Sequence, residues 1–261
     1  MEVVIQSDAA AIARLVADEV QGLLAARPGA VLGLATGSSP LAVYDELVRR
    51  HEAGAVSFAR ARAFMLDEYV GLPDGHPERY RNVIEREFAG RVDLPAAAVQ
   101  GPDGNAADRP AACAAYEAAI DAAGGVDLQL LGIGTDGHIA FNEPGSSLAS
   151  RTRIKTLTSQ TRRDNARFFD GDVEAVPRHC RTQGLATIMS ARHLVLVAAG
   201  AGKAEAVHHL VEGPVSAMWP ATIMQHHPHA TVLVDDAAAS RLQLAGYYRE
   251  VFAGKPSWQG L

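Results

Sequence analysis

The sequence predicts an α/β protein with a doubly wound, mostly parallel sheet of the Rossmann-like kind and helices on both faces. Three observations predict this fold. Short apolar runs recur along the chain, stretches with apolar residues at helical spacing separate most of them, and several runs end in loops rich in glycine and small hydroxyl side chains. Alternating strands and helices form a parallel sheet covered by helices, and such a sheet binds ligands beyond the carboxyl ends of its strands. We expect a single domain over residues 1–261.

Composition and charge narrow the class of protein. The chain is 48% hydrophobic and 21% charged, which is ordinary for a globular protein, and its net charge of −6 argues against nucleic-acid binding. The N-terminus lacks the basic and apolar segments of a secretory signal, and no apolar run approaches the ~18 residues of a membrane span. Cys113 and Cys180 lie far apart, which suits two free thiols in a reducing cytosol. We therefore expect a cytoplasmic protein that binds neither nucleic acid nor membranes.

A helix and a strand are predicted at the start of the chain. Ser7 and Asp8 are good N-cap residues, and apolar residues then recur at helical spacing from Ile12 to Leu24. The apolar run 31–34 is typical of a short buried strand.

The loop after that strand is the first candidate ligand site. It contains Thr36, Gly37, Ser38 and Ser39, and Ser39 is predicted to cap a helix that has Pro40 in its first turn. Free backbone N–H groups, the helix dipole and the hydroxyl donors would together favour an anion. An ordinary capped turn explains the loop equally well. The ending of a nucleotide-binding loop, G-K-[ST], is absent from it.

Two adjacent acidic residues follow the next predicted strand, the apolar run 63–66. Asp67 and Glu68 stand where a buried strand emerges, and carboxylates there cost free energy unless they are paired or used. One would be a general base and the other structural, or the pair would cap the next segment, and spacing alone does not distinguish these interpretations. Helices are predicted around residues 80–88 and 110–123, joined by a connection rich in proline, glycine and aspartate.

The stretch from Val126 to Glu143 is the one around which the chain is organised. An apolar strand closed by glycines leads into Asp136, His138 and Glu143. An imidazole with a carboxylate on either side in the sequence can be held in one tautomer and one orientation, as a proton-shuttling histidine requires. A glycine turn with a structurally bonded histidine is the alternative interpretation.

The same stretch matches the dinucleotide fingerprint G-x-G-x-x-G at Gly132, Gly134 and Gly137. We disfavour a dinucleotide site for two reasons. Pro144 follows too soon for the helix that the fingerprint must open, and Asp136 would direct a negative charge at the phosphates.

The second half of the chain contains two further candidate anion sites. Basic residues alternate with threonine and isoleucine over residues 151–156, which predicts a strand or extended loop with one basic face. That face is either a charged edge strand or a second, regulatory anion site. Lys203 follows the predicted strand 193–199, in the first turn of a helix through Val211. A cation is unfavourable at a helix N-terminus, so its presence indicates an anion nearby.

The end of the chain is predicted to hold a strand at residues 230–234 and a closing helix at 237–248, and residues 182–189 suit a helix. Histidines cluster before that last strand, at positions His226, His227 and His229. A metal site is one interpretation, but adjacent histidines rarely face one ion and no cysteine or acidic partner stands at helical spacing. We therefore expect no metal site.

Three blocks of residues, Leu66–Leu72, Gly134–Pro144 and Ser146–Thr156, resemble those of the glucosamine-6-phosphate deaminase family. The resemblance extends from near the N-terminus to about residue 235. It implies conversion of glucosamine 6-phosphate and water into fructose 6-phosphate and ammonium, in amino-sugar catabolism. The resemblance implies no cofactor, because the substrate's own carbonyl group acts as the electron sink.

The resemblance also implies roles for individual residues. Asp67 would take the proton from C2 of the substrate. His138 would assist opening of the sugar ring, positioned by Asp136 and Glu143. Recognition of the phosphate would fall to Thr36, Gly37, Ser38, Ser39, Arg167 and Lys203.

Many members of this family are homohexamers activated by N-acetylglucosamine 6-phosphate bound between subunits. The positions that correspond to that effector site are Ser146, Arg153, Lys155 and Thr156. The chain departs from the family pattern at Arg249, where a tyrosine of the effector site is expected, and at Ala35 and Ser38 in the loop before the second helix. We expect a homo-oligomer, with the function of the effector site left open.

Three alternatives remain. A 6-phosphogluconolactonase-like hydrolase would share the fold and the phosphate site, but it is not expected to combine Asp67, Glu68 and Tyr69 with the 151–156 block. A non-enzymatic sugar-phosphate sensor would need an attached DNA-binding helix pair, and the chain starts directly with its first α/β helix. A pyridoxal-phosphate enzyme would need a Schiff-base lysine, and the position of Lys203 in a first helical turn suits phosphate better.

Overall fold

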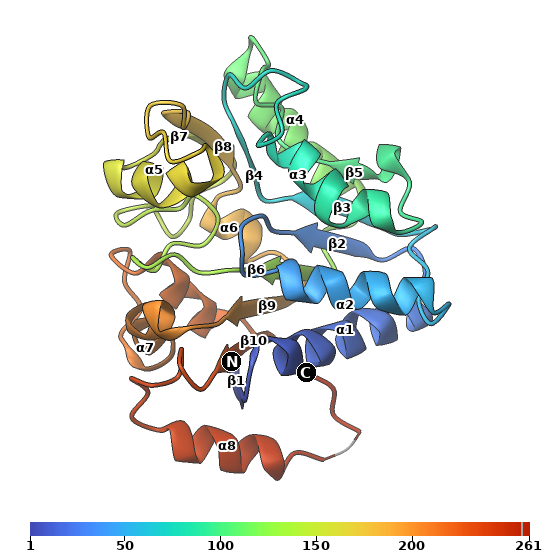
Figure 1. Cartoon of the computed structure of the whole chain (residues 1–261), viewed down its shortest axis with the longest axis vertical. Coiled ribbons are helices and arrows are strands. Elements are labelled where there is room, and N and C mark those ends of the chain that lie inside the picture. The colour runs from blue at the N-terminus through green and yellow to red at the C-terminus, as the bar shows by residue number, and fades with distance from the viewer. Residues whose placement is uncertain (257) are drawn as a thin grey trace.

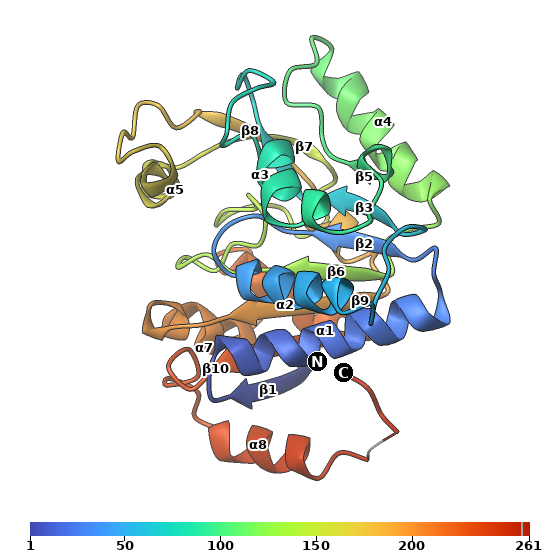
Figure 2. The ribbon, with the colours of Figure 1, turned by 45° about the vertical axis from the view of Figure 1, so that its right-hand side comes forward.

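The computed structural model describes residues 1–256 and 258–261. A seven-stranded sheet lies at the centre of this part of the chain (Figure 1). All its neighbouring strands are parallel, in the order β1-β10-β9-β6-β2-β3-β5. The strands are β1 (Glu2–Gln6), β2 (Val31–Leu34), β3 (Arg62–Met65), β5 (Val99–Gln100), β6 (Leu128–Leu131), β9 (His193–Ala198) and β10 (Ala230–Asp235). Because they run the same way, the loops after β2, β3, β6 and β9 emerge at one edge of the sheet (Figure 2).

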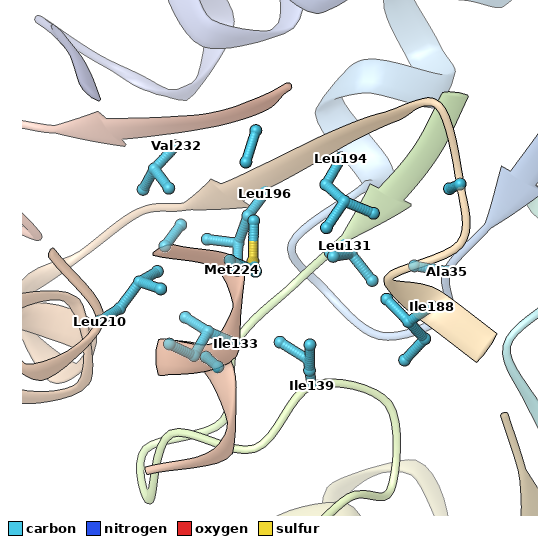
Figure 3. Packing of buried hydrophobic residues seen from close by; sticks show 14 of the residues in the cluster. Ala35, Leu131, Ile133, Ile139, Ile188, Leu194, Leu196, Leu210, Met224 and Val232 are labelled. Carbon is cyan, nitrogen blue, oxygen red and sulfur yellow. The ribbon is translucent and has the colours of Figure 1, made fainter. Parts of the chain in front are cut away.

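Helices cover both faces of this sheet, which confirms the predicted doubly wound α/β fold. Successive strand residues point to opposite faces. In β9, Val195 and Val197 join a core cluster with α1, α2 and α3, whereas Leu194 and Leu196 join one with α4, α6 and α7 (Figure 3). These helices are α1 (Ala9–Ala26), α2 (Leu41–Glu52), α3 (Tyr80–Glu87), α4 (Arg109–Ala122), α6 (Leu185–Ile188) and α7 (Ala204–Glu212).

A second, antiparallel sheet begins where β3 ends. It consists of β4 (Asp67–Tyr69), β8 (His179–Thr182) and β7 (Arg153–Thr156), with β8 in the middle. The residue Thr182 pairs with Asp67 on one side and with Arg153 on the other. The strand β7 confirms the extended segment predicted around residues 151–156. The helix α5 (Ser159–Asn165) follows β7.

Several predicted element boundaries are wrong. Residue Thr182 belongs to β8, so the helix predicted at 182–189 is limited to α6. The closing helix α8 spans Ala245–Ala253 rather than residues 237–248. The carboxylate of Asp235 accepts hydrogen bonds from the backbone N–H groups of Gly200 and Ala238, which holds the chain after β10 in a turn.

The N-cap prediction holds for α1 and fails for α2. The Asp8 carboxylate accepts a hydrogen bond of 2.8 Å from the backbone N–H of Ala11. In α2 the N-cap residue is Pro40, without a side-chain cap, so Ser39 lies in the loop and not at the cap. The strands β1, β4, β5 and β8 were not predicted. Across the described residues, no helix combines the length and the apolar character needed to cross a membrane.

Candidate active site

The loops at the carboxyl ends of β2, β3, β6 and β9 enclose a cavity of about 520 Å³. Residues predicted for catalysis and residues predicted for phosphate binding line it. They are the Thr36–Ser39 loop, Asp67, His138, Arg167 and Lys203. Segments far apart in the sequence meet here because β2, β3, β6 and β9 are parallel and occupy neighbouring places in the sheet.

One side of the cavity is built from groups that suit an anion. The Thr36–Ser39 loop supplies hydroxyl groups, and the guanidinium of Arg167 and the ammonium of Lys203 supply positive charge. The Lys203 Nζ donates a hydrogen bond of 2.7 Å to the carbonyl oxygen of Ile133, at the start of the loop that follows β6. Burial lowers the pKa of Lys203, and the charge of Arg167 lowers it further. A bound anion would offset both effects, because it attracts the two cations.

The adjacent carboxyl groups Asp67 and Glu68 have different surroundings, which resolves the alternatives left open by the sequence. Both Glu68 oxygens are engaged at the start of α3. Oε1 accepts from the backbone N–H groups of Tyr69 and Tyr80 at 2.9 Å, and Oε2 accepts from that of Arg81 at 3.0 Å. Glu68 is therefore structural, and it caps a helix N-terminus.

The Asp67 carboxyl group lines the cavity and is only 6% exposed. Burial raises the pKa of Asp67 well above its usual range, and the negative charge of Glu68 raises it further. A carboxylate with a raised pKa is a stronger base once it is ionised. The geometry therefore favours Asp67 as a general base facing a bound ligand.

His138 and Asp136 form a close pair in the loop that follows β6. Nδ1 of His138 lies 2.6 Å from Oδ1 of Asp136, and the backbone N–H of His138 donates to the same oxygen at 3.2 Å. Burial alone would raise the pKa of Asp136, but hydrogen bonding to His138 and its charge outweigh burial, and the pKa falls below its usual value. An ionised Asp136 beside Nδ1 leaves Nε2 of His138 as the ring nitrogen for proton exchange.

A tight turn holds this pair in place. The backbone N–H of Gly134 donates to the carbonyl oxygen of His138 at 2.9 Å. The imidazole lies directly over Gly134, where a Cβ atom would stand 2.3 Å from Cε1 of His138, so only glycine fits. Ile133 and Ile139, on either side of the turn, are buried in the core (Figure 3).

Glu143, expected to position His138, is engaged elsewhere. Its carboxylate accepts a hydrogen bond of 2.6 Å from Oγ1 of Thr161 and one of 3.0 Å from the backbone N–H of Thr158. These bonds tie the end of the central segment to the N-terminus of α5. Among the hydrogen bonds of the described residues, none joins Glu143 to His138.

The predicted effector residues lie outside the cavity. Arg153 and Lys155 are half-buried on β7, Thr156 is exposed at its end, and Ser146 is buried. Nη1 of Arg153 donates a hydrogen bond of 2.9 Å to Oδ1 of Asn142, and burial lowers the pKa of the guanidinium. The central segment that contains His138 is therefore linked directly to β7.

Tyr80 is a cavity residue that sequence reasoning missed. It lines the cavity at the start of α3, stacks on Phe141 with ring centres 5.9 Å apart, and burial raises the pKa of its hydroxyl. The sequence showed Tyr80 only as a member of an apolar helical stripe. No spacing in the sequence indicated that Tyr80 would face the cavity, because its place depends on the contact between Glu68 and the start of α3.

The histidines near residue 227 have structural partners. Nε2 of His227 lies 2.8 Å from the carbonyl oxygen of Ala191, and Nε2 of His229 lies 2.8 Å from the backbone oxygen of Leu261. The rings of His229 and His193 stack at 3.6 Å. Within residues 1–256 and 258–261, no group of three or more histidine, cysteine or acidic side chains is arranged to hold a metal ion.

Comparisons with known proteins show the family of the chain. The family of glucosamine-6-phosphate isomerases and 6-phosphogluconolactonases matches residues 6–233. Proteins named glucosamine-6-phosphate deaminase are 78% identical in Beutenbergia cavernae and 72% identical in Mycolicibacterium smegmatis, over 261 residues and the full length of both chains.

Solved structures show the same relationship. A monomeric glucosamine-6-phosphate deaminase is 40% identical, with a TM-score of 0.90 over 92% of this chain and 100% of the other. The 6-phosphogluconolactonase from Trypanosoma cruzi is 19% identical, with a TM-score of 0.74 over 93% and 97% of the two chains, and thus shares the fold. The chain belongs to the family of glucosamine-6-phosphate isomerases and 6-phosphogluconolactonases.

Proposed function

We propose that this chain is a glucosamine-6-phosphate deaminase, which converts glucosamine 6-phosphate and water into fructose 6-phosphate and ammonium in amino-sugar catabolism. The observation that carries the proposal is one cavity with a buried carboxyl group, Asp67, a histidine paired with a carboxylate, His138, and an anion-binding side. Full-length relatives at 78% and 72% identity carry the same name, which supports the proposal.

In this proposal the anion side of the cavity holds the phosphate of the substrate. The Thr36–Ser39 loop, Arg167 and Lys203 supply the donors and the positive charge. The phosphate fixes the sugar so that its other end reaches His138 and Asp67. Holding the reacting carbon beside a catalytic group is itself a large part of catalysis, because it removes the entropy of bringing the groups together.

The His138 imidazole assists opening of the ring. It exchanges a proton through Nε2 with the ring oxygen and the C1 hydroxyl group, while Asp136 holds Nδ1. Ring opening produces an aldehyde at C1. That carbonyl group makes the proton on C2 acidic enough for a carboxylate to remove.

Asp67 then takes the proton from C2, and the electron pair moves into the carbonyl group to give an enolic intermediate. A proton returned to C1 leaves a C2 imine. Water adds to the imine carbon, the C2–N bond breaks, and ammonium leaves with fructose 6-phosphate. General acid and base catalysis contributes about 100- to 10,000-fold to the rate for each group, so both side chains matter.

The oligomer and the effector belong to this proposal as its untested part. The positions Ser146, Arg153, Lys155 and Thr156 would bind N-acetylglucosamine 6-phosphate in a homo-oligomer, with a hexamer as the expected form. The structural relative with 40% identity is described as monomeric, so the oligomeric state needs its own measurement. The cytoplasmic location also stays a prediction.

A direct test compares two substrates. Purified protein is given glucosamine 6-phosphate and, separately, 6-phosphogluconolactone, both with a chelator present. We expect release of ammonium and fructose 6-phosphate from the first and no lactone hydrolysis above background. Hydrolysis of the lactone without ammonium release would favour the hydrolase alternative, and binding of both sugars without turnover would favour the sensor.

A further inference from the structure

The loop that holds the Asp136–His138 pair is braced from outside by residues 216–222, before and within the η5 turn (Pro220–His226). Two backbone hydrogen bonds connect the brace to the central segment. The backbone N–H of Ala221 donates to the carbonyl oxygen of Gly137 at 2.9 Å. The backbone N–H of Gly145 donates to the carbonyl oxygen of Ala217 at 2.8 Å. The brace is therefore hydrogen-bonded at Gly137 and at Gly145, one on either side of Ile139. Met224 of this turn and Ile133 of the loop after β6 belong to the same buried cluster (Figure 3).

The indole of Trp219 packs between residues 216–222 and the loop that follows β6. A Cβ atom at Gly137 would stand 2.5 Å from Cε3 of Trp219, so the indole rests on the bare backbone of Gly137. Gly137 has φ of +79°, a left-handed conformation that favours glycine. Gly137 lies between Asp136 and His138 in the sequence. A movement of its backbone would therefore change the geometry of the pair.

The indole also contacts α7. The His209 imidazole stacks on Trp219 with ring centres 3.8 Å apart and planes 17° from parallel. Nε2 of His209 lies 3.2 Å from Oε1 of Glu205, one helical turn earlier. Thr222 holds the backbone of the brace, because its buried Oγ1 donates to the carbonyl oxygen of Trp219 at 2.7 Å and accepts from the N–H of Ser216 at 2.8 Å. The indole thus has little freedom to move.

From these contacts we propose that Trp219, which contacts both His209 and Gly137, is a positioning residue that keeps the Asp136–His138 pair in its catalytic geometry. It does not line the cavity, so it acts through the loop and not on the substrate. The inference rests on the proposed role of His138 in the deaminase reaction. The Thr36–Ser39 loop, Arg167 and Lys203 lie outside the 134–138 turn, so removal of the indole should leave binding of the phosphate intact.

The first test measures steady-state turnover of glucosamine 6-phosphate. We expect Trp219→Ala to lower kcat by about 10- to 100-fold, the size of effect that a misplaced catalytic group produces, and to change KM by less than about twofold. Trp219→Phe keeps a flat ring and should recover most of the lost kcat. Met218→Ala is the matched control, because the neighbouring Met218 is 62% exposed and should leave kcat unchanged.

A double-mutant cycle separates positioning from general destabilisation. In an Asp136→Asn background the pair is already broken, so Trp219→Ala should lower kcat by less than about threefold more. An equal drop in both backgrounds, or a rise in KM as large as the fall in kcat, would overturn the proposal. If Trp219→Ala does not fold, His209→Ala can replace it in the double-mutant cycle. This variant removes only the ring that stacks on Trp219, so we expect a smaller fall in kcat, again reduced in the Asp136→Asn background.

A final measurement does not depend on the reaction. The carboxyl carbon of Asp136 can be titrated by NMR in the wild type, Trp219→Ala and Met218→Ala. His138 keeps the pKa of Asp136 low, so loosening the pair should move that pKa upward in Trp219→Ala alone. An unchanged titration would overturn the positioning role. A wild type without ammonium release would instead contradict the proposed function, whichever way Asp136 titrates.

Discussion

Asp67 and Glu68 are neighbours in the sequence, yet one faces the cavity and the other caps a helix. They lie on the short strand β4, where successive side chains point to opposite sides. The sequence predicted that one acid would be a base and the other structural, but spacing could not assign the roles. The assignment depends on α3, whose first N–H groups meet Glu68 from a later part of the chain.

The raised pKa of Asp67 links activity to stability. Between its ordinary pKa and its raised pKa, the folded protein binds a proton that the unfolded chain has released. The free energy of unfolding therefore decreases as the pH rises through this window. Asp67→Asn has no carboxyl group to ionise and so does not lose stability in this pH range. Its urea midpoint should exceed the wild-type midpoint at pH values above the raised pKa and approach it at pH values below the ordinary pKa. A midpoint difference that is independent of pH would contradict the buried-carboxyl account.

Lys203 is expected to act in binding. A hydrogen bond to a charged group contributes about 1.5–3 kcal/mol, so Lys203→Ala should raise KM for glucosamine 6-phosphate by about 10- to 100-fold, with a smaller effect on kcat. Lys255→Ala is the control, because Lys255 pairs with Glu2 away from the cavity and should leave KM unchanged. An unchanged KM in Lys203→Ala would exclude the phosphate role.

Among the elements, the buried apolar strands were the most predictable. β2, β6, β9 and β10 coincide with apolar runs because parallel strands buried on both faces carry apolar side chains almost throughout. The strand β8 was hidden because it contains Arg181, a buried arginine whose guanidinium binds the carbonyl oxygens of Asp103 and Ala106. No local pattern indicates that such a polar segment lies inside. The start of α8 was predicted too early because the sequence pattern around Ala238 and Ala239 resembles the apolar side of a helix. In the structure these two buried residues lie in a turn.

Glu68 should matter for α3 more than for chemistry. Glu68→Ala leaves the partly buried N–H groups of Tyr80 and Arg81 without an acceptor, so the free energy of unfolding should fall by about 1–3 kcal/mol. Glu68→Gln keeps one acceptor oxygen and should cost less. Urea denaturation checks both, with the exposed Glu250→Ala as control. If Glu68→Ala is as stable as Glu250→Ala, the capping role is wrong.

At the scale of the whole molecule, the parallel sheet explains why the cavity could be foreseen. Loops that follow neighbouring parallel strands meet at one edge, so the Thr36–Ser39 loop, Asp67, His138 and Lys203 were predictable as one site. The brace at residues 216–222 was not predictable. It depends on the approach of Trp219 to a bare glycine, and no spacing in the sequence indicates such a contact.

The predicted effector site would form only in an assembly of several copies of the chain. If Ser146, Arg153, Lys155 and Thr156 bind N-acetylglucosamine 6-phosphate, Arg153→Ala should abolish activation while basal turnover at saturating substrate stays the same. Initial rates with and without the effector, together with sedimentation of the wild type, check this expectation. A monomer that does not respond to the effector, or a fully activated Arg153→Ala variant, would contradict it.

We propose that the reaction depends on Asp67, and one measurement tests that proposal most directly. Ammonium and fructose 6-phosphate released from glucosamine 6-phosphate are measured for the wild type and for Asp67→Asn, which keeps the shape of the side chain and removes the base. We predict stoichiometric release by the wild type and a fall in kcat of about 100- to 10,000-fold in Asp67→Asn, with KM nearly unchanged. Turnover by Asp67→Asn at the wild-type rate would contradict the account.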